Sequence, residues 1–175
     1  MPAQQRTSAE QDRLYAEATS LYGAALERLA RAYEPDLERR RDLLQEIQLA
    51  VWRSFAGFGE QCSMRTWVYR VAHNVATSQV VRRRGRVPTW VSLDELAELH
   101  GSRDWERQFG EQHALERLFA LIEQLRPLDR QVIVLYLEDT DAATIGEITG
   151  LSAVNVATKV HRIKRLLIER FRKGS

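Results

Sequence analysis

Hydrophobic residues recur at helical spacing along most of the chain. Leucines and alanines fall at three- and four-residue steps from Ser8 to about Tyr33, and apolar residues recur at four-residue steps through residues 36–56. The same spacing, with Gly and Pro between the segments, predicts further helices over residues 64–84, 111–125, 127–138, 141–149 and 152–172. Because no segment alternates between apolar and polar positions as a strand does, we expect an all-α fold.

The third predicted helix follows a Ser63 N-cap and mixes apolar with basic residues. On its spacing, we place Trp67, Val71, Val75 and Ser78 on the side that faces the core. A tryptophan on such a stripe is more often buried than exposed. From the pattern alone, we therefore expect Trp67 to be a core residue.

The helical pattern breaks down over residues 86–110, which are polar and acidic. Ser92-Leu93-Asp94-Glu95 matches a capping box, so this stretch holds at most one short helix. A loop of this length is unusual inside one compact domain. We therefore predict two small helical domains, residues 8–85 and 111–175, joined by an acidic flexible linker.

Composition favours a globular protein of the cytoplasm. Of the 175 residues 44% are hydrophobic and 29% are charged, and no apolar run approaches the roughly 18 residues of a transmembrane helix. The N-terminus lacks the apolar core of a signal peptide, so we expect no membrane insertion. One cysteine and four scattered histidines predict neither a disulfide nor a metal site. Since no phosphate loop or nucleophile–base pair occurs either, we expect no enzymatic activity and no cofactor.

Charge is unevenly distributed, although the net charge is only +2. Residues 62–86 hold six arginines and no acid, residues 92–111 hold six acids and two arginines, and residues 159–173 hold seven basic residues and one acid. Two basic segments separated by an acidic one suggest two contacts with nucleic acid. Solvated helix faces are the alternative explanation.

Residues 141–160 predict a helix-turn-helix, with a short helix, a turn at Gly150, a Ser152 cap and a second helix. The second helix carries an apolar stripe of Val156, Val160, Ile163 and Leu167. Its polar side carries residue types that bond to bases and phosphates in the major groove, namely Asn155, Thr158, Lys159 and Arg162. This pattern favours DNA binding over an ordinary helical hairpin with a hydrophilic outside.

The N-terminal half holds two further candidate surfaces. Residues 36–56 expose a mixed-charge pattern that is typical of a solvated or protein-facing surface. The next helix combines aromatic residues with arginines, which suits unstacked single-stranded bases because rings stack on bases and guanidinium groups hold phosphates.

Taken in order, these segments resemble bacterial sigma factors of the sigma-70 type, in the small extracytoplasmic-function (ECF) group that keeps only regions 2 and 4. Residues 42–52 (DLLQEIQLAVW) resemble the region 2.2 helix. Residues 64–74 (MRTWVYRVAHN), followed by Arg82 and Arg83, resemble regions 2.3 and 2.4, and residues 125–164 resemble region 4.

The resemblance implies a protein that binds core RNA polymerase, recognises the −10 and −35 promoter elements and directs transcription initiation, while the polymerase performs the chemistry. The implied polymerase-docking residues are Asp42, Gln45, Glu46, Gln48 and Arg53. The implied −10 contacts are Phe58, Gln61, Ser63, Arg65, Trp67, Arg70, Asn74, Arg82 and Arg83. Of these, Asn74 and the loop before the third helix would hold a flipped-out base. The implied −35 contacts are Ser152, Asn155, Thr158, Lys159, His161 and Arg162. An anti-sigma factor, which restrains many relatives, is a further candidate partner.

Two positions depart from the family pattern. Ser78 stands where members often carry Asp, and Lys159 stands where the recognition helix usually carries Arg. A lysine acts as a point charge, whereas an arginine can grip guanine with two hydrogen bonds. We therefore expect a different base preference at these positions.

Two other classes of protein stay open from the residues alone. A polymerase-independent helix-turn-helix regulator accounts for residues 111–175 but leaves the arginine and aromatic residues of the third helix without a role. It predicts duplex binding without polymerase. An all-helical adaptor requires both basic faces to be merely solvated, and predicts no salt-dependent binding to DNA.

Overall fold

The computed structural model describes residues 7–83, Leu93 and residues 114–173. Within these residues it holds seven α-helices, one short 3-10 helix and no strand, which confirms the all-α prediction. Clustering of contacts divides the chain into two compact units, Met1–Arg86 and Val87–Ser175. The predicted linker, apart from Leu93, and its capping box lie outside the described residues.

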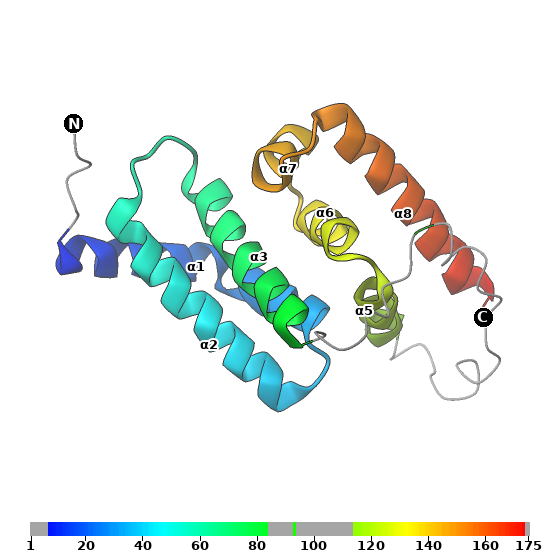
Figure 1. Ribbon diagram of the computed structural model, residues 1–175, viewed down its shortest axis with the longest axis horizontal. Coiled ribbons are helices and arrows are strands. Elements are labelled where there is room, and N and C mark those ends of the chain that lie inside the picture. Colours follow the sequence, from blue (N-terminus) through cyan, green and yellow to red (C-terminus); the bar gives the residue numbers. More distant parts are fainter. Residues whose placement is uncertain (1–6, 84–92, 94–113, 174–175) are drawn as a thin grey trace. The chain divides into compact units, whose positions relative to one another are not determined.

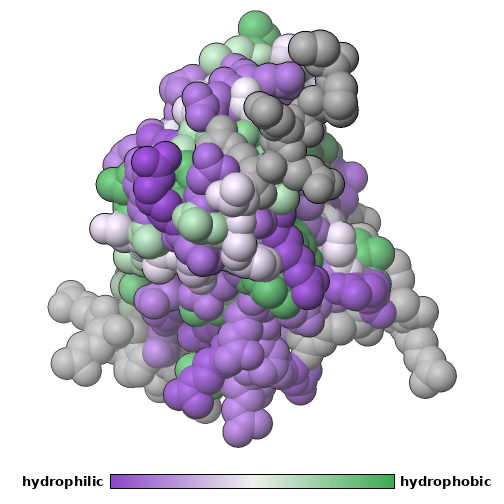
Figure 2. Space-filling view, turned by 90° about the vertical axis from the view of Figure 1, so that its left-hand side faces the viewer, coloured by the Kyte–Doolittle hydropathy of each residue, from purple (hydrophilic) through white to green (hydrophobic). Residues whose placement is uncertain are grey.

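The first unit is built from three helices that pack side by side, α1 (Ser8–Tyr33), α2 (Leu37–Ser54) and α3 (Met64–Arg83) (Figure 1). A 3-10 turn, η1 (Phe55–Gly57), follows α2 directly. The core between the helices is formed by Leu29, Leu43, Ile47, Phe55, Val68 and Ala72. Polar side chains cover most of the face shown in Figure 2, with smaller hydrophobic areas between them. The apolar spacing in the sequence therefore located these three helices correctly.

The buried face of α3 differs from the prediction. Val68, Ala72 and Ala76 are fully buried, whereas Trp67 is half-buried and Ser78 is exposed. Valine and alanine occur on both sides of this helix, so its apolar pattern is nearly symmetrical. The larger side chains at Trp67, Val71 and Val75 marked the wrong side as the core, and all three are half-buried at its margin.

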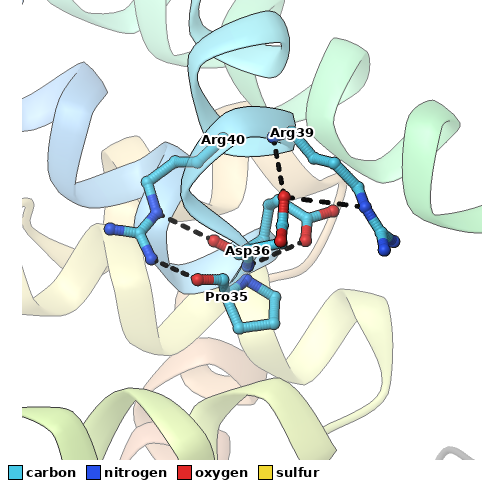
Figure 3. Close-up of polar contacts among 5 residues, drawn as sticks. Pro35, Asp36, Arg39 and Arg40 are labelled. Atoms are coloured by element: carbon cyan, nitrogen blue, oxygen red, sulfur yellow. Dashed lines mark hydrogen bonds and ion pairs between the residues drawn. The ribbon is translucent and has the colours of Figure 1, made fainter.

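The connection from α1 to α2 is fixed by a cluster of polar contacts at the start of α2 (Figure 3). The Asp36 carboxylate accepts the backbone N–H of Arg39 at 3.0 Å and lies 3.6 Å from its Nε. The Arg40 guanidinium donates to the carbonyls of Glu34 at 2.9 Å and Pro35 at 2.6 Å. The Asp36 contact satisfies a backbone N–H that a helix start leaves without an intrahelical partner, and the Arg40 contacts satisfy two carbonyls of the connection between α1 and α2.

Side-chain hydrogen bonds tie α2 and α3 to the two ends of α1. Trp52 donates from Nε1 to Asp12 at 2.8 Å, and Gln11 donates from its side-chain amide to the Trp52 carbonyl at 3.3 Å. Near the other end of α1, the Tyr33 hydroxyl lies 3.1 Å from Nδ1 of His73, which is completely buried. These contacts fix the positions of α2 and α3 against α1.

The second unit contains α5 (Ala114–Gln124), α6 (Pro127–Leu137), α7 (Ala142–Thr149) and α8 (Ala153–Lys173). Asp141 caps α7, and the Thr144 backbone N–H and hydroxyl hold the pKa of its carboxyl below the usual range. Ser152 caps α8 by accepting the Asn155 N–H at 3.2 Å. The predicted stripe of α8 is confirmed, because its members, Val156, Val160, Ile163 and Leu167, are all buried.

The turn between α7 and α8 depends on two glycines. Gly150 has φ +79°, a left-handed conformation that glycine adopts readily and that ends many helices. Gly146 lies so close to the next segment that a Cβ atom there would approach the Leu151 carbonyl oxygen to 2.6 Å. The sequence indicates the first glycine through its position after a helix, whereas the second acts through a close approach that only the structure shows.

Replacing Gly146 by alanine should therefore lower the free energy of unfolding of the second unit by about 2 kcal/mol, because the added methyl forces backbone to move. A urea titration of the full chain, followed by circular dichroism, measures the effect. Gly57→Ala is the matched control, since no atom lies within 4 Å of its Cβ position. Equal stability of the two variants would show that the Leu151 carbonyl can move far enough from residue 146 to accept the added methyl group.

No helix within the described ranges is long and apolar enough to cross a bilayer.

Candidate nucleic-acid interface

The exposed face of α2 carries most of the residues that the sequence assigns to polymerase docking. Asp42, Gln45, Glu46 and Arg53 are exposed, and Gln48 is half-buried. Leu49 lies on the same face and is 47% exposed, although the sequence analysis did not select it. Its spacing of three residues from Glu46 is the signal that could have identified it. The face therefore combines charge with an apolar centre, as protein-binding surfaces often do.

An open groove of about 850 Å³ runs between α2 and α3. It is lined by Glu46, Leu49, Ala50, Arg53 and Ser54 from α2 and by Asn74, Val75, Ser78 and Arg82 from α3. Glu46 and Arg82 face each other across it, with a carboxylate oxygen 3.9 Å from a guanidinium nitrogen. The groove thus brings together residues that the sequence assigns to two different partners.

One end of the first unit is held by an aromatic cluster. The centre of the Trp67 ring lies 5.3 Å from the centre of the Phe58 ring, which lies 5.8 Å from the centre of the Phe55 ring. Trp67 also donates from Nε1 to the Ser54 hydroxyl at 2.8 Å, which links α3 to the end of α2. Phe58 is only 6% exposed and packs in the core of the unit, so its predicted −10 contact has little exposed surface in this structure.

A left-handed residue and a helix cap shape the loop between η1 and α3. Glu60 has φ 57°, and Ser63 caps α3 by accepting the Thr66 N–H at 3.1 Å. Gln61 and Ser63 are exposed, whereas the free Cys62 is half-buried. Of the predicted −10 residues in this loop, Gln61 and Ser63 are therefore accessible to a ligand.

The predicted −10 residues of α3 divide between two sides of the helix. Because each residue turns an α-helix by about 100°, Trp67, Arg70, Asn74 and Arg82 fall on the side that borders the groove. Of these, Asn74 and Arg82 are exposed and Arg70 is half-buried. Arg65 points elsewhere, with its guanidinium carbon 5.6 Å from the centre of the Tyr69 ring. The side chain of Arg83 lies outside the described atoms.

Most of the predicted −35 residues are exposed on α8. Ser152, Asn155, Thr158, His161 and Arg162 all face solvent. Lys159 does not, because its ammonium lies 2.6 Å from an Asp129 carboxylate oxygen, and the Lys159 side chain is only 27% exposed. Lys159 is therefore half-buried and paired in this structure, and its contact with the −35 element stays a prediction.

Asp129, which the sequence analysis did not select, is the buried partner in this contact. Its side chain is 2% exposed, and Arg126 contributes a second, longer ion pair at 3.5 Å. Asp129 stands in the first turn of α6, where an acid is common because it interacts favourably with the helix dipole. Because the helix dipole already explains an acid at this position, the sequence does not indicate that Asp129 pairs with Lys159, thirty residues further along the chain.

No group of three or more histidine, cysteine or acidic side chains within residues 7–83 and 114–173 is arranged to hold a metal ion.

Two family models match this chain in the order of its two units. The sigma-70 region 2 model matches residues 19–86, and the sigma-70 region 4 model matches residues 115–167. The ECF RNA polymerase sigma factor SigG of Mycobacterium tuberculosis is 30% identical over 155 residues, which cover 75% of this chain and 41% of the relative. The RNA polymerase sigma-H factor of Pseudomonas aeruginosa is 29% identical over 129 residues, which cover 70% and 62%. The chain thus spans less than two thirds of the length of these relatives. With matches to the region 2 and region 4 models and to these relatives, the chain belongs to the sigma-70 family of RNA polymerase sigma factors, in its ECF group.

Proposed function

We propose that this chain binds core RNA polymerase, recognises the −10 and −35 elements of a promoter and directs transcription initiation. The observation that carries the proposal is the groove between α2 and α3, where Glu46 from the docking face lies opposite Asn74 and Arg82 from the promoter-binding set. A factor that opens DNA on the polymerase surface needs its protein-binding and strand-binding residues side by side. The groove supplies that adjacency.

In this proposal the two units divide the work. The exposed face of α2 docks on the polymerase. The neighbouring side of α3 holds the melted −10 strand through Asn74 and Trp67, with Arg70 near its phosphates and Arg82 on the duplex edge upstream. Taking a base out of its stack costs a few kcal/mol, which the contacts to base and phosphates offset. The exposed side of α8 binds the −35 element as duplex. The chain acts by binding, and it works in the cytoplasm, where the polymerase and its template are found.

Reversing the charge of Glu46 tests the docking face. Glu46→Arg places a third cation beside Arg53 and Arg82 in the groove, so we expect about tenfold weaker assembly with core polymerase. The measurement is competition between the full chain and another sigma factor for a limited amount of core enzyme. Glu27→Arg, at an exposed position on α1, is the matched control and should compete as the unaltered chain does.

Unchanged competition by the Glu46 variant would show that polymerase docks elsewhere on the chain. No assembly by the unaltered chain, together with salt-sensitive binding to duplex DNA, would instead support a polymerase-independent helix-turn-helix regulator.

A further inference from the structure

The side of α8 that lies opposite its buried stripe is not the side that its hydrogen-bonding residues suggest. Val156 and Val160 face the core, and a turn of about 100° per residue places Val154 and Thr158 almost opposite them. His161 and Arg165 continue this line, and both are exposed. The side of the helix that is best placed to enter a groove therefore begins with a valine.

Val154 is 75% exposed, the largest exposure among the large hydrophobic side chains that the structure describes. Ala153 and Ala157, which flank it on the helix, are exposed as well, so the first turns of α8 present a small surface of methyl groups. Lys159, which could have supplied a charged contact nearby, is held against Asp129. The first turns of α8 are therefore less polar than we would expect of a surface that contacts phosphates alone.

The residues at the start of a recognition helix are those that contact base edges in the major groove. Among the groups exposed on those edges, the 5-methyl of thymine is the apolar one, and alanine-sized and larger apolar side chains bind it. We propose that Val154, flanked by Ala153 and Ala157, recognises thymine methyl groups in the duplex that α8 binds. The inference rests on the proposed function and names Val154 as a specificity-determining residue. Arg165, 70% exposed on the same line and 3.9 Å from a Glu169 carboxylate oxygen, lies about three turns beyond Val154 and supplies positive charge for the phosphates.

Deoxyuridine tests this contact directly, because it differs from thymidine only by lacking the methyl group. The full chain, assembled with core RNA polymerase, first selects promoters from a pool with a randomised −35 region. Each thymine of the selected −35 element is then replaced singly by deoxyuridine, and initiation is measured. At one position, or at each of two adjacent positions, we expect the single replacement to weaken promoter use by the unaltered chain about fourfold. This is the effect of losing one buried methyl-sized group.

Val154→Ser, which replaces the apolar side chain by a small polar one, should lose most of this distinction and use thymine and deoxyuridine promoters within about twofold of each other. Ile168→Ala, which shortens another exposed side chain of α8, is the matched control and should keep the fourfold distinction. A selected element without thymine, or an equal deoxyuridine effect in the Val154 variant and the unaltered chain, would overturn the inference while leaving the proposed function intact. Failure to form a complex or to initiate on any promoter would overturn both.

Discussion

Replacing Lys159 by alanine is expected to lower the free energy of unfolding of the second unit by about 3 kcal/mol. The Lys159 ammonium is the nearer of the two cations beside the Asp129 carboxylate, which is 2% exposed. Without it, the carboxylate stays buried, and among the described cations it keeps the longer Arg126 contact at 3.5 Å. Burying a charge without an adequate partner is among the costliest changes in a protein interior.

Hydrogen exchange of the full chain, followed by mass spectrometry on peptides from α6 and α8, measures this loss in the unit where it occurs. Arg162→Ala, three residues further along at an exposed position of α8, is the matched control and should change the stability by less than about 0.5 kcal/mol. Replacing the pair together, with Asp129→Asn and Lys159→Met, should recover at least half of the loss, because no charge is then left buried. Equal protection in the Lys159 and Arg162 single variants would mean that the ion pair contributes little.

The first unit is expected to lose stability on mild acidification through His73. Complete burial lowers the pKa of this imidazole from 6.5 to about 3. Between these two values the unfolded chain binds a proton that the folded chain does not, so the stability that is fully present above pH 6.5 is lost as the pH falls toward 3. The slope approaches about 1.4 kcal/mol per pH unit, or on the order of 3 kcal/mol by about pH 4.

His73→Gln removes the titrating group and keeps a side chain that can bond to the Tyr33 hydroxyl. Urea titrations of the full chain at several pH values between about 4 and 7 should show a shallower pH dependence in this variant, whatever its stability at neutral pH. His161→Gln, at an exposed histidine of α8, should keep the original slope. Parallel curves for the His73 variant and the unaltered chain would show that other groups carry the acid sensitivity.

The helices were predictable because the signals that define them are local. Caps such as Ser63 and Ser152, the turn glycine Gly150 and the spacing of leucines and valines act within a few residues of each helix end. The apolar stripe of α8 was also predictable, since large aliphatic residues stand on one side of it. On α3 the same reasoning failed, because Ala72 and Ala76 fill the core while the larger Trp67 lies at its margin.

The candidate site was harder to predict because its geometry depends on contacts between distant segments. Helical spacing alone placed Lys159 among the groove-facing residues, and only the position of α6 reveals that Asp129 holds it. Phe58 was selected from its loop, yet Trp67 packs against its ring. Val154 was not predicted as a contact because its side chain offers no hydrogen bond to a base or phosphate. Position on the helix and polarity therefore point to partly different residues of α8.

In the function that we propose, this chain gives core RNA polymerase the ability to start at particular promoters. The most direct test is to mix the purified chain with bacterial core enzyme and a pool of templates randomised at the −10 and −35 regions, and to sequence the transcripts and their upstream DNA. We expect initiation that core enzyme alone does not support, from templates that share two sequence elements. Transcripts that match those of core enzyme alone, with no shared upstream element, would contradict it.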